Sequence, residues 1–139
     1  MPHAGETTGP ETIWDSLRLL GAERIGHGTS STQDPSLVRH LADNAIPLEV
    51  CPTSNIATRA VETFDMHPIK QMYAAGIVVT INSDDPPMFG TTLNQEYAVA
   101  ARLLDLDEAG IKGLAQNAVD ASFSPDDVKR RLTAELAAY

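Results

Sequence analysis

Four short clusters of polar residues carry the side chains suited to chemistry. His3 and Glu6 stand three residues apart, His27 lies between two glycines, and Asp84 and Asp85 are adjacent. Imidazole nitrogen and carboxylate oxygen are common Zn²⁺ ligands, so His3 and Asp84 are candidate metal ligands. Glu6 and His27 are candidates for holding or moving a proton. These residue types suit the activation of water by a metal ion.

Each cluster also has an ordinary structural explanation. A His-x-x-Glu pair is common, a histidine between glycines is most often a loop residue, and Asp-Asp-Pro is commonly a turn before a helix. Cys51, which opens the remaining cluster at 51–55, is typical of a small buried hydrophobic residue. The position of the clusters along the chain is therefore more informative than any one of them.

Three of the clusters follow segments that read as strands. These are 24–27, 48–51 and 77–81, and the last is a nearly continuous β-branched run, as expected for a strand buried on both faces. Segments with helical periodicity separate them, which predicts parallel βαβ units. The carboxyl ends of such strands form one rim where ligands bind. We therefore expect the clusters to converge on one pocket, including the cluster at 3–6, which has no visible strand before it.

The length of the chain limits the architecture. Its 139 residues suit one domain with a modest core and fall below the roughly 200–250 residues of a closed (β/α)₈ barrel. We expect residues 1–139 to form a single partial domain, with βα units carrying the site over 1–90. The part at 91–139 reads as helical.

Composition excludes several classes of function. The net charge is −9, with 19 acidic against 10 basic residues, so a nucleic-acid partner is not expected. The longest apolar run, 74–81, is far too short to span a membrane. One cysteine rules out a disulfide framework within the chain and a cysteine-rich zinc finger. The first residues contain no secretory signal, so we expect a cytoplasmic location.

The clusters together resemble the adenosine deaminase family, whose members include adenosine, adenine and related aminopurine deaminases. The resemblance implies an α/β fold: the C-terminal half of a (β/α)₈ TIM barrel of the metal-dependent hydrolase type, followed by C-terminal helices. The cytidine-deaminase type of zinc enzyme needs a Pro-Cys-x-x-Cys signature that one cysteine cannot supply. The motifs that carry the resemblance are His3-Ala4-Gly5-Glu6, Arg24-Ile25-Gly26-His27-Gly28, Cys51-Pro52-Thr53-Ser54-Asn55 and Ser83-Asp84-Asp85-Pro86.

The resemblance also implies roles for the charged residues of the motifs. His3 and Asp84 look like ligands of a single Zn²⁺ ion. Glu6 looks like the acid that protonates purine N1, and His27 looks like the residue that activates or orients the attacking hydroxide. The scheme requires Glu6 to carry a proton while Asp84 is ionised beside the cation.

The implied substrate is a small 6-aminopurine compound. Adenosine, adenine and aminodeoxyfutalosine all fit, and the reaction would be hydrolytic deamination of a cyclic amidine C–N bond to the 6-oxopurine and ammonia. Asp85 looks like a residue that bonds a purine ring nitrogen, and Gly5 looks like a further substrate-binding residue. Ser54 and Asn55 would have supporting roles at the pocket rim.

The chain departs from the family pattern in one respect. The family binds its metal with a His-x-His pair as well, and the four histidines here, at 3, 27, 40 and 67, contain none. Two ligands alone bind Zn²⁺ far more weakly than three or four. We therefore expect the isolated chain to be inactive or nearly so, with zinc weak or absent, and to need a second polypeptide that supplies the first half. The alternative is a catalytically inactive truncated remnant or an interaction module.

Overall fold

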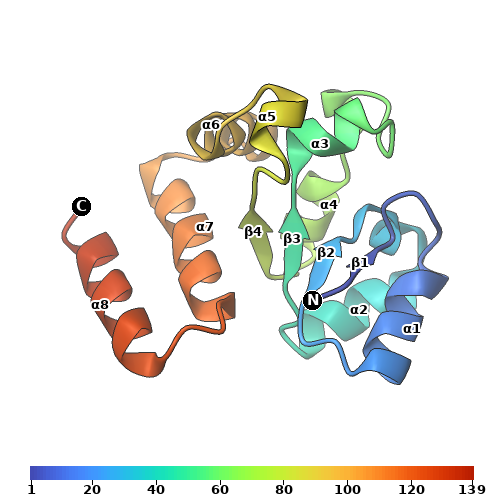
Figure 1. Cartoon of the computed structure of the whole chain (residues 1–139), viewed down its shortest axis with the longest axis horizontal. Helices are drawn as coiled ribbons and strands as arrows, with labels where there is room; N and C mark the ends of the chain where they lie inside the picture. Colours follow the sequence, from blue (N-terminus) through green and yellow to red (C-terminus); the bar gives the residue numbers. More distant parts are fainter.

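Four parallel strands form the single sheet of the protein. The computed structural model describes all of residues 1–139. Neighbouring strands in the sheet are also consecutive along the chain, in the order β1-β2-β3-β4 (Figure 1). This order is that of successive βα units in the wall of a barrel. The strands are β1 (His3–Ala4), β2 (Ile25–His27), β3 (Leu48–Val50) and β4 (Val79–Ile81).

Helices connect the strands and complete the C-terminal part. Helix α2 (Pro35–Asp43) starts at an N-cap, where Asp34 Oδ1 accepts the backbone N–H groups of Ser36 and Leu37. No helix combines the length and apolar character that a membrane span needs. The helices are α1 (Glu11–Leu20), η1 (Thr29–Gln33), α2 (Pro35–Asp43), α3 (Pro52–Ala57), η2 (Phe64–Met66), α4 (Ile69–Ala74), α5 (Pro86–Phe89), α6 (Leu93–Leu104), α7 (Glu108–Ala121) and α8 (Asp126–Ala137).

One hydrophobic cluster joins the sheet to the helices around it. Ile25, Leu48 and Val79 from three strands are fully buried and belong to the same cluster as apolar residues of α1, α2, α4, α6 and α7. Burial of each such side chain stabilises the fold by about 1.5–3 kcal/mol. The strands are therefore held rigidly, and so are the residues at their carboxyl ends.

The C-terminal helices included in the fold prediction are α6, α7 and α8. Helix α7 packs along β4, and α8 packs on α7 at the outside of the molecule (Figure 1). Asn117 on α7 donates from Nδ2 to the carbonyl oxygen of Val79 at 3.0 Å, which links this helix directly to the sheet. Helix α8 buries no residue, so it contributes little to the core.

The strands differ in detail from the sequence prediction. His3 lies in a strand of its own, β1, which pairs His3 with Gly26 and Ala4 with His27. Strand β4 begins at Val79 rather than at 77, because the N–H of Ile77 is bonded to the carbonyl of Met72 at the end of α4. After β3 the chain enters α3 at once, where the sequence suggested only polar residues at a pocket rim.

Candidate active site

The clusters that follow the strands converge on one cavity. His3 lies in β1, His27 ends β2, and Asp84 follows β4 after two residues. All three line a cavity of about 430 Å³, together with Cys51 at the end of β3. The structure thus brings together residues separated by as many as 81 positions, which is the arrangement the parallel strands predict.

His27 lies at the centre of this arrangement. Its side chain is 2% exposed, and its Nε2 atom is 3.6 Å from Glu6 Oε2 and 3.9 Å from Asp84 Oδ2. Burial lowers the pKa of His27, and the charges of Glu6 and Asp84 oppose that effect. The residue has a left-handed backbone, with φ 64°, which costs about 1–3 kcal/mol for a non-glycine residue and is typical of functional positions.

Asp84 and Asp85 point to different partners. Asp84 Oδ2 accepts a 2.7 Å hydrogen bond from Ser54 Oγ, and its other oxygen makes no hydrogen bond within the protein. Asp85 Oδ1 instead accepts the N–H of Met88 and caps α5. The two adjacent side chains diverge at a turn in which Asp84 has φ 55°. A contact between Asp85 and a purine nitrogen stays a prediction.

Glu6 is positioned by the turn at Gly5. Gly5 has φ +63°, and a Cβ atom there would collide with Ile13 Cδ1, so only glycine fits without a shift. Its N–H donates to Thr12 Oγ1, and its carbonyl accepts the backbone N–H of Ser30. A substrate contact at Gly5 stays a prediction, and it would be a close approach rather than a hydrogen bond, because both backbone groups already have partners.

Ser54 and Asn55 have a larger part in the site than the sequence indicated. Both are buried on α3, at 1% and 0% exposure. Ser54 bonds Asp84, and Asn55 Nδ2 lies 3.0 Å from His27 Nδ1. Pro52 starts α3 one residue after β3, and this short helix places Ser54 against Asp84 and Asn55 against His27.

Sequence reasoning missed Glu96 altogether. This carboxylate on α6 is fully buried, and Oε2 accepts the backbone N–H of Thr53 at 3.0 Å while Oε1 accepts the hydroxyl of Thr91. It joins α6 to the start of α3. Glu96 falls among the apolar residues of α6 at helical spacing, and this pattern was the signal that could have indicated its burial.

The donor set of the cavity suits a zinc ion. His27, Cys51 and Asp84 each offer a ligand atom, and these atoms lie within 4.8 Å of one another. Burial, reinforced by nearby carboxylates, raises the pKa of the Cys51 thiol to about 12, so this sulfur is a poor ligand by itself. Zinc binds nitrogen and oxygen donors, and the cavity offers the imidazole of His3 and the free oxygen of Asp84. The ring centroids of His3 and His27 are 5.1 Å apart. These donors fit part of a zinc site.

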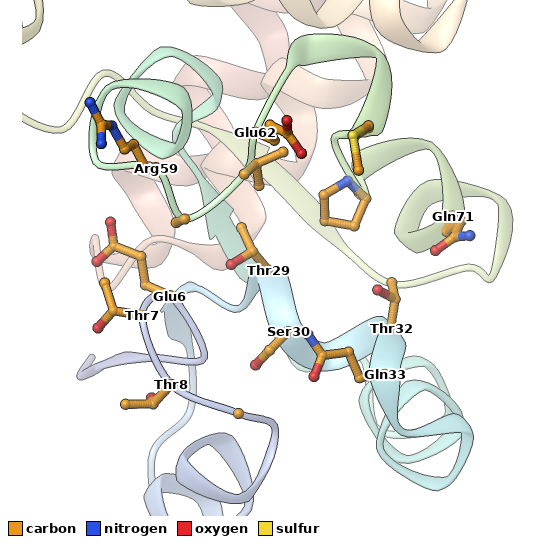
Figure 2. Close-up of a pocket in the computed structure, with 15 residues that line it drawn as sticks. Glu6, Thr7, Thr8, Thr29, Ser30, Thr32, Gln33, Arg59, Glu62 and Gln71 are labelled. Carbon is orange, nitrogen blue, oxygen red and sulfur yellow. The ribbon is translucent and has the colours of Figure 1, made fainter.

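A second cavity, of about 590 Å³, borders Glu6. Figure 2 shows Glu6 and Thr7 on one side, Thr32 and Gln33 on the other, and Thr29 between them. The remaining polar lining includes one cation, Arg59, and the acid Glu62. Five of the fifteen lining residues carry a hydroxyl group, so the cavity suits a polar part of a ligand. Its lining residues are Glu6, Thr7, Thr8, Gly9, Thr29, Ser30, Thr32, Gln33, Arg59, Ala60, Val61, Glu62, Met66, Pro68 and Gln71.

Comparison with known proteins decides the family. The family model described as adenosine deaminase matches residues 1–139, the whole chain. This chain belongs to the adenosine deaminase family. The resemblance that the motifs indicated is confirmed, and the adenosine deaminase relatives include enzymes named for different substrates.

Two curated relatives within the adenosine deaminase family illustrate that range. The chain is 70% identical over 139 residues to the aminodeoxyfutalosine deaminase of Streptomyces avermitilis and covers 39% of that enzyme. It is 42% identical over 134 residues to the adenine deaminase of Sinorhizobium medicae and covers 41% of it. The chain therefore spans about two fifths of the length of the curated relatives it matches.

A solved structure of the adenosine deaminase family confirms the fold. The adenine deaminase of Arthrobacter aurescens superimposes with a TM-score of 0.93 at 35% identity. The match covers 98% of this chain and 42% of that enzyme. The four parallel strands and their helices thus form part of a barrel of this family, as the fold prediction stated.

Proposed function

We propose that the protein containing this chain is a metal-dependent deaminase that converts aminodeoxyfutalosine to its 6-oxopurine product and ammonia. The observation that carries the proposal is the position of His27 Nε2, 3.6 Å from Glu6 and 3.9 Å from Asp84. An acid, an imidazole and a carboxylate within 4 Å of that imidazole are the groups that hydrolysis of an amidine needs. The choice of substrate is supported by 70% identity to the Streptomyces avermitilis enzyme, against 42% to an adenine deaminase.

The metal in this proposal is zinc. His3 and Asp84 would hold it, together with ligands from outside these 139 residues. When bound, Zn²⁺ would lower the pKa of a water molecule and so supply a nucleophile near neutral pH.

The residues of the chain would perform the remaining steps. Glu6 gives a proton to purine N1, which makes C6 more electrophilic. His27 and Asp84 hold the attacking oxygen by hydrogen bonds as it forms a bond to C6. The C6–N bond then breaks, one proton of the water leaves with ammonia, and the other restores Glu6.

The second cavity supports a substrate larger than adenine. It borders Glu6, so a purine with N1 at that carboxylate would lie beside it. The hydroxyl groups of its lining match the polar part of a substituted purine. A free base would leave this space to water.

A hybrid enzyme tests the proposal. This chain replaces the matching 39% of the Streptomyces avermitilis enzyme, and ammonia release is measured with aminodeoxyfutalosine, adenosine and adenine. We expect the highest kcat/KM with aminodeoxyfutalosine. A folded hybrid with no activity on any of the three would favour the catalytically inactive remnant instead, and preference for adenine would correct the substrate.

A further inference from the structure

We propose that Asn55 and His67 are positioning residues that fix His27 as its Nε2–H tautomer, so that His27 presents an N–H donor to the site. Neither residue lines the cavity that His27 shares with His3 and Asp84. The tautomer is a property of this chain alone. Only its catalytic meaning rests on the proposed function.

The chain of hydrogen bonds starts at the backbone of α4. The N–H of Ile69 donates a 3.1 Å hydrogen bond to His67 Nδ1. A backbone amide can only donate, so Nδ1 carries no proton. His67 is 6% exposed, and burial lowers its pKa to about 4, so the ring is neutral near pH 7. The one ring proton of His67 must therefore be on Nε2.

That proton orients the amide of Asn55. His67 Nε2 lies 3.2 Å from Asn55 Oδ1, and the oxygen must face it, because the amide nitrogen would oppose one donor with another. Asn55 has no exposed surface, so water does not compete for these bonds. The Nδ2 group is then directed at His27 Nδ1, 3.0 Å away.

The amide in turn determines the protonation of His27. An amide NH₂ group can only donate, so His27 Nδ1 accepts and has no proton of its own. The neutral imidazole must carry its proton on Nε2, since the bond made by one ring nitrogen determines the state of the other. The three bonds form one directed chain from Ile69 to His27.

The opposite side of His27 agrees with this assignment. Nε2 faces two acceptors, Glu6 Oε2 and Asp84 Oδ2. An N–H there is attracted to both oxygens, whereas a lone pair would be repelled. In the deamination, neutral His27 therefore donates a hydrogen bond to the attacking oxygen and does not take its proton. Of the two roles the sequence left open, activating or orienting, this favours orienting.

Nitrogen NMR of the imidazole rings tests the tautomer directly. The full 139-residue chain, labelled with ¹⁵N-histidine, is measured well above the ordinary histidine pKa of about 6.5. We expect the Nδ1 atoms of His27 and His67 at the shift of an unprotonated ring nitrogen, and their Nε2 atoms at that of a protonated one. A protonated Nδ1 on His27, or averaging of its two nitrogens, overturns the proposal.

Two variants test the chain of bonds. Asn55→Asp places an acceptor oxygen at His27 Nδ1 while Glu6 and Asp84 still face Nε2, so we expect His27 to gain a proton on Nδ1 and both of its nitrogens to take the shift of a protonated ring nitrogen. His67→Asn keeps an acceptor for the Ile69 N–H but is too short to orient Asn55, so the His27 nitrogens should shift toward averaged values. His40→Gln is the control and should leave the His27 shifts unchanged.

Unmoved His27 shifts in both test variants contradict the positioning role. If either variant fails to fold, the wild-type spectrum alone decides the tautomer.

Discussion

Ser54 Oγ donates a 2.7 Å hydrogen bond to Asp84 Oδ2, joining the helix after β3 to the turn after β4. The bond occupies one carboxylate oxygen and leaves the other without a hydrogen-bond partner in the protein. A carboxylate held in this way is oriented before any metal binds, which increases metal affinity.

Removal of this hydroxyl should weaken metal binding. In the hybrid enzyme we expect Ser54→Ala to reduce zinc affinity by about 10–100-fold, the usual effect of losing a hydrogen bond to a metal ligand. Competition with a chelator measures it. Thr53→Ala is the control, because the Thr53 side chain makes no hydrogen bond, and equal affinities for the two variants would contradict the role of Ser54.

The turn at Gly5 should tolerate no side chain. Gly5→Ala places Cβ against Ile13 in a left-handed backbone, and we expect the free energy of unfolding to fall by about 2–4 kcal/mol. Gly21 has a similar φ of +59° with nothing within 4 Å of its Cβ position, so Gly21→Ala should cost only about 1 kcal/mol. Urea denaturation measures both, and equal losses would show that the contact with Ile13 does not matter.

Mild acid should destabilise the protein through His67. Burial lowers the pKa of His67 to about 4 from its ordinary 6.5, so between these values the unfolded chain binds a proton that the folded chain does not. The free energy of unfolding should therefore decrease as pH falls from 6.5 to 4, by about 3 kcal/mol at the end of that range. His27, whose pKa is also lowered, adds a decrease of the same sign.

The pH dependence has a matched control. His67→Asn has no imidazole at this position, so its stability should change less over the same range than that of the wild type. Hydrogen bonds with Ser36 and Trp14 lower the pKa of Asp34 to about 2, but wild type and variant both contain Asp34, so its effect on the two curves is the same. Parallel curves for wild type and variant would be evidence against a buried neutral His67.

The hydroxyl-lined cavity should affect the binding of substituted purines only. Thr32 lines this cavity, and its hydroxyl makes no hydrogen bond within the protein. In the hybrid, Thr32→Val should raise KM for aminodeoxyfutalosine by about 3–10-fold, the value of one neutral hydrogen bond. KM for adenine should not change, and an equal rise for both compounds would place the substituent elsewhere.

The sequence predicts which polar clusters lie close together better than it predicts the bounds of the strands. His27, Asp84 and Glu6 each follow or interrupt a recognisable pattern, and parallel topology requires strand ends to meet. Strand β1 has two residues, and its pairing with β2 is invisible to any local pattern. A strand this short exists only because a neighbour supplies its hydrogen bonds.

The supporting residues could not be assigned from spacing. Asn55 contacts His27 across 28 positions and His67 across 12. His67 reads as an ordinary residue before a proline, and nothing local shows that its ring is buried and bonded on both nitrogens. Such roles depend on tertiary contacts, which a single sequence does not display.

The most direct test of the whole account compares two variants of the hybrid. Glu6→Gln should abolish deamination of aminodeoxyfutalosine while zinc stays bound, since Gln keeps the shape but has no acidic proton. Asp84→Ala should lose both zinc and activity. Metal content and ammonia release are measured on the same samples, and near-native turnover by Glu6→Gln, or full zinc content in Asp84→Ala, would contradict a deaminase site built from these residues.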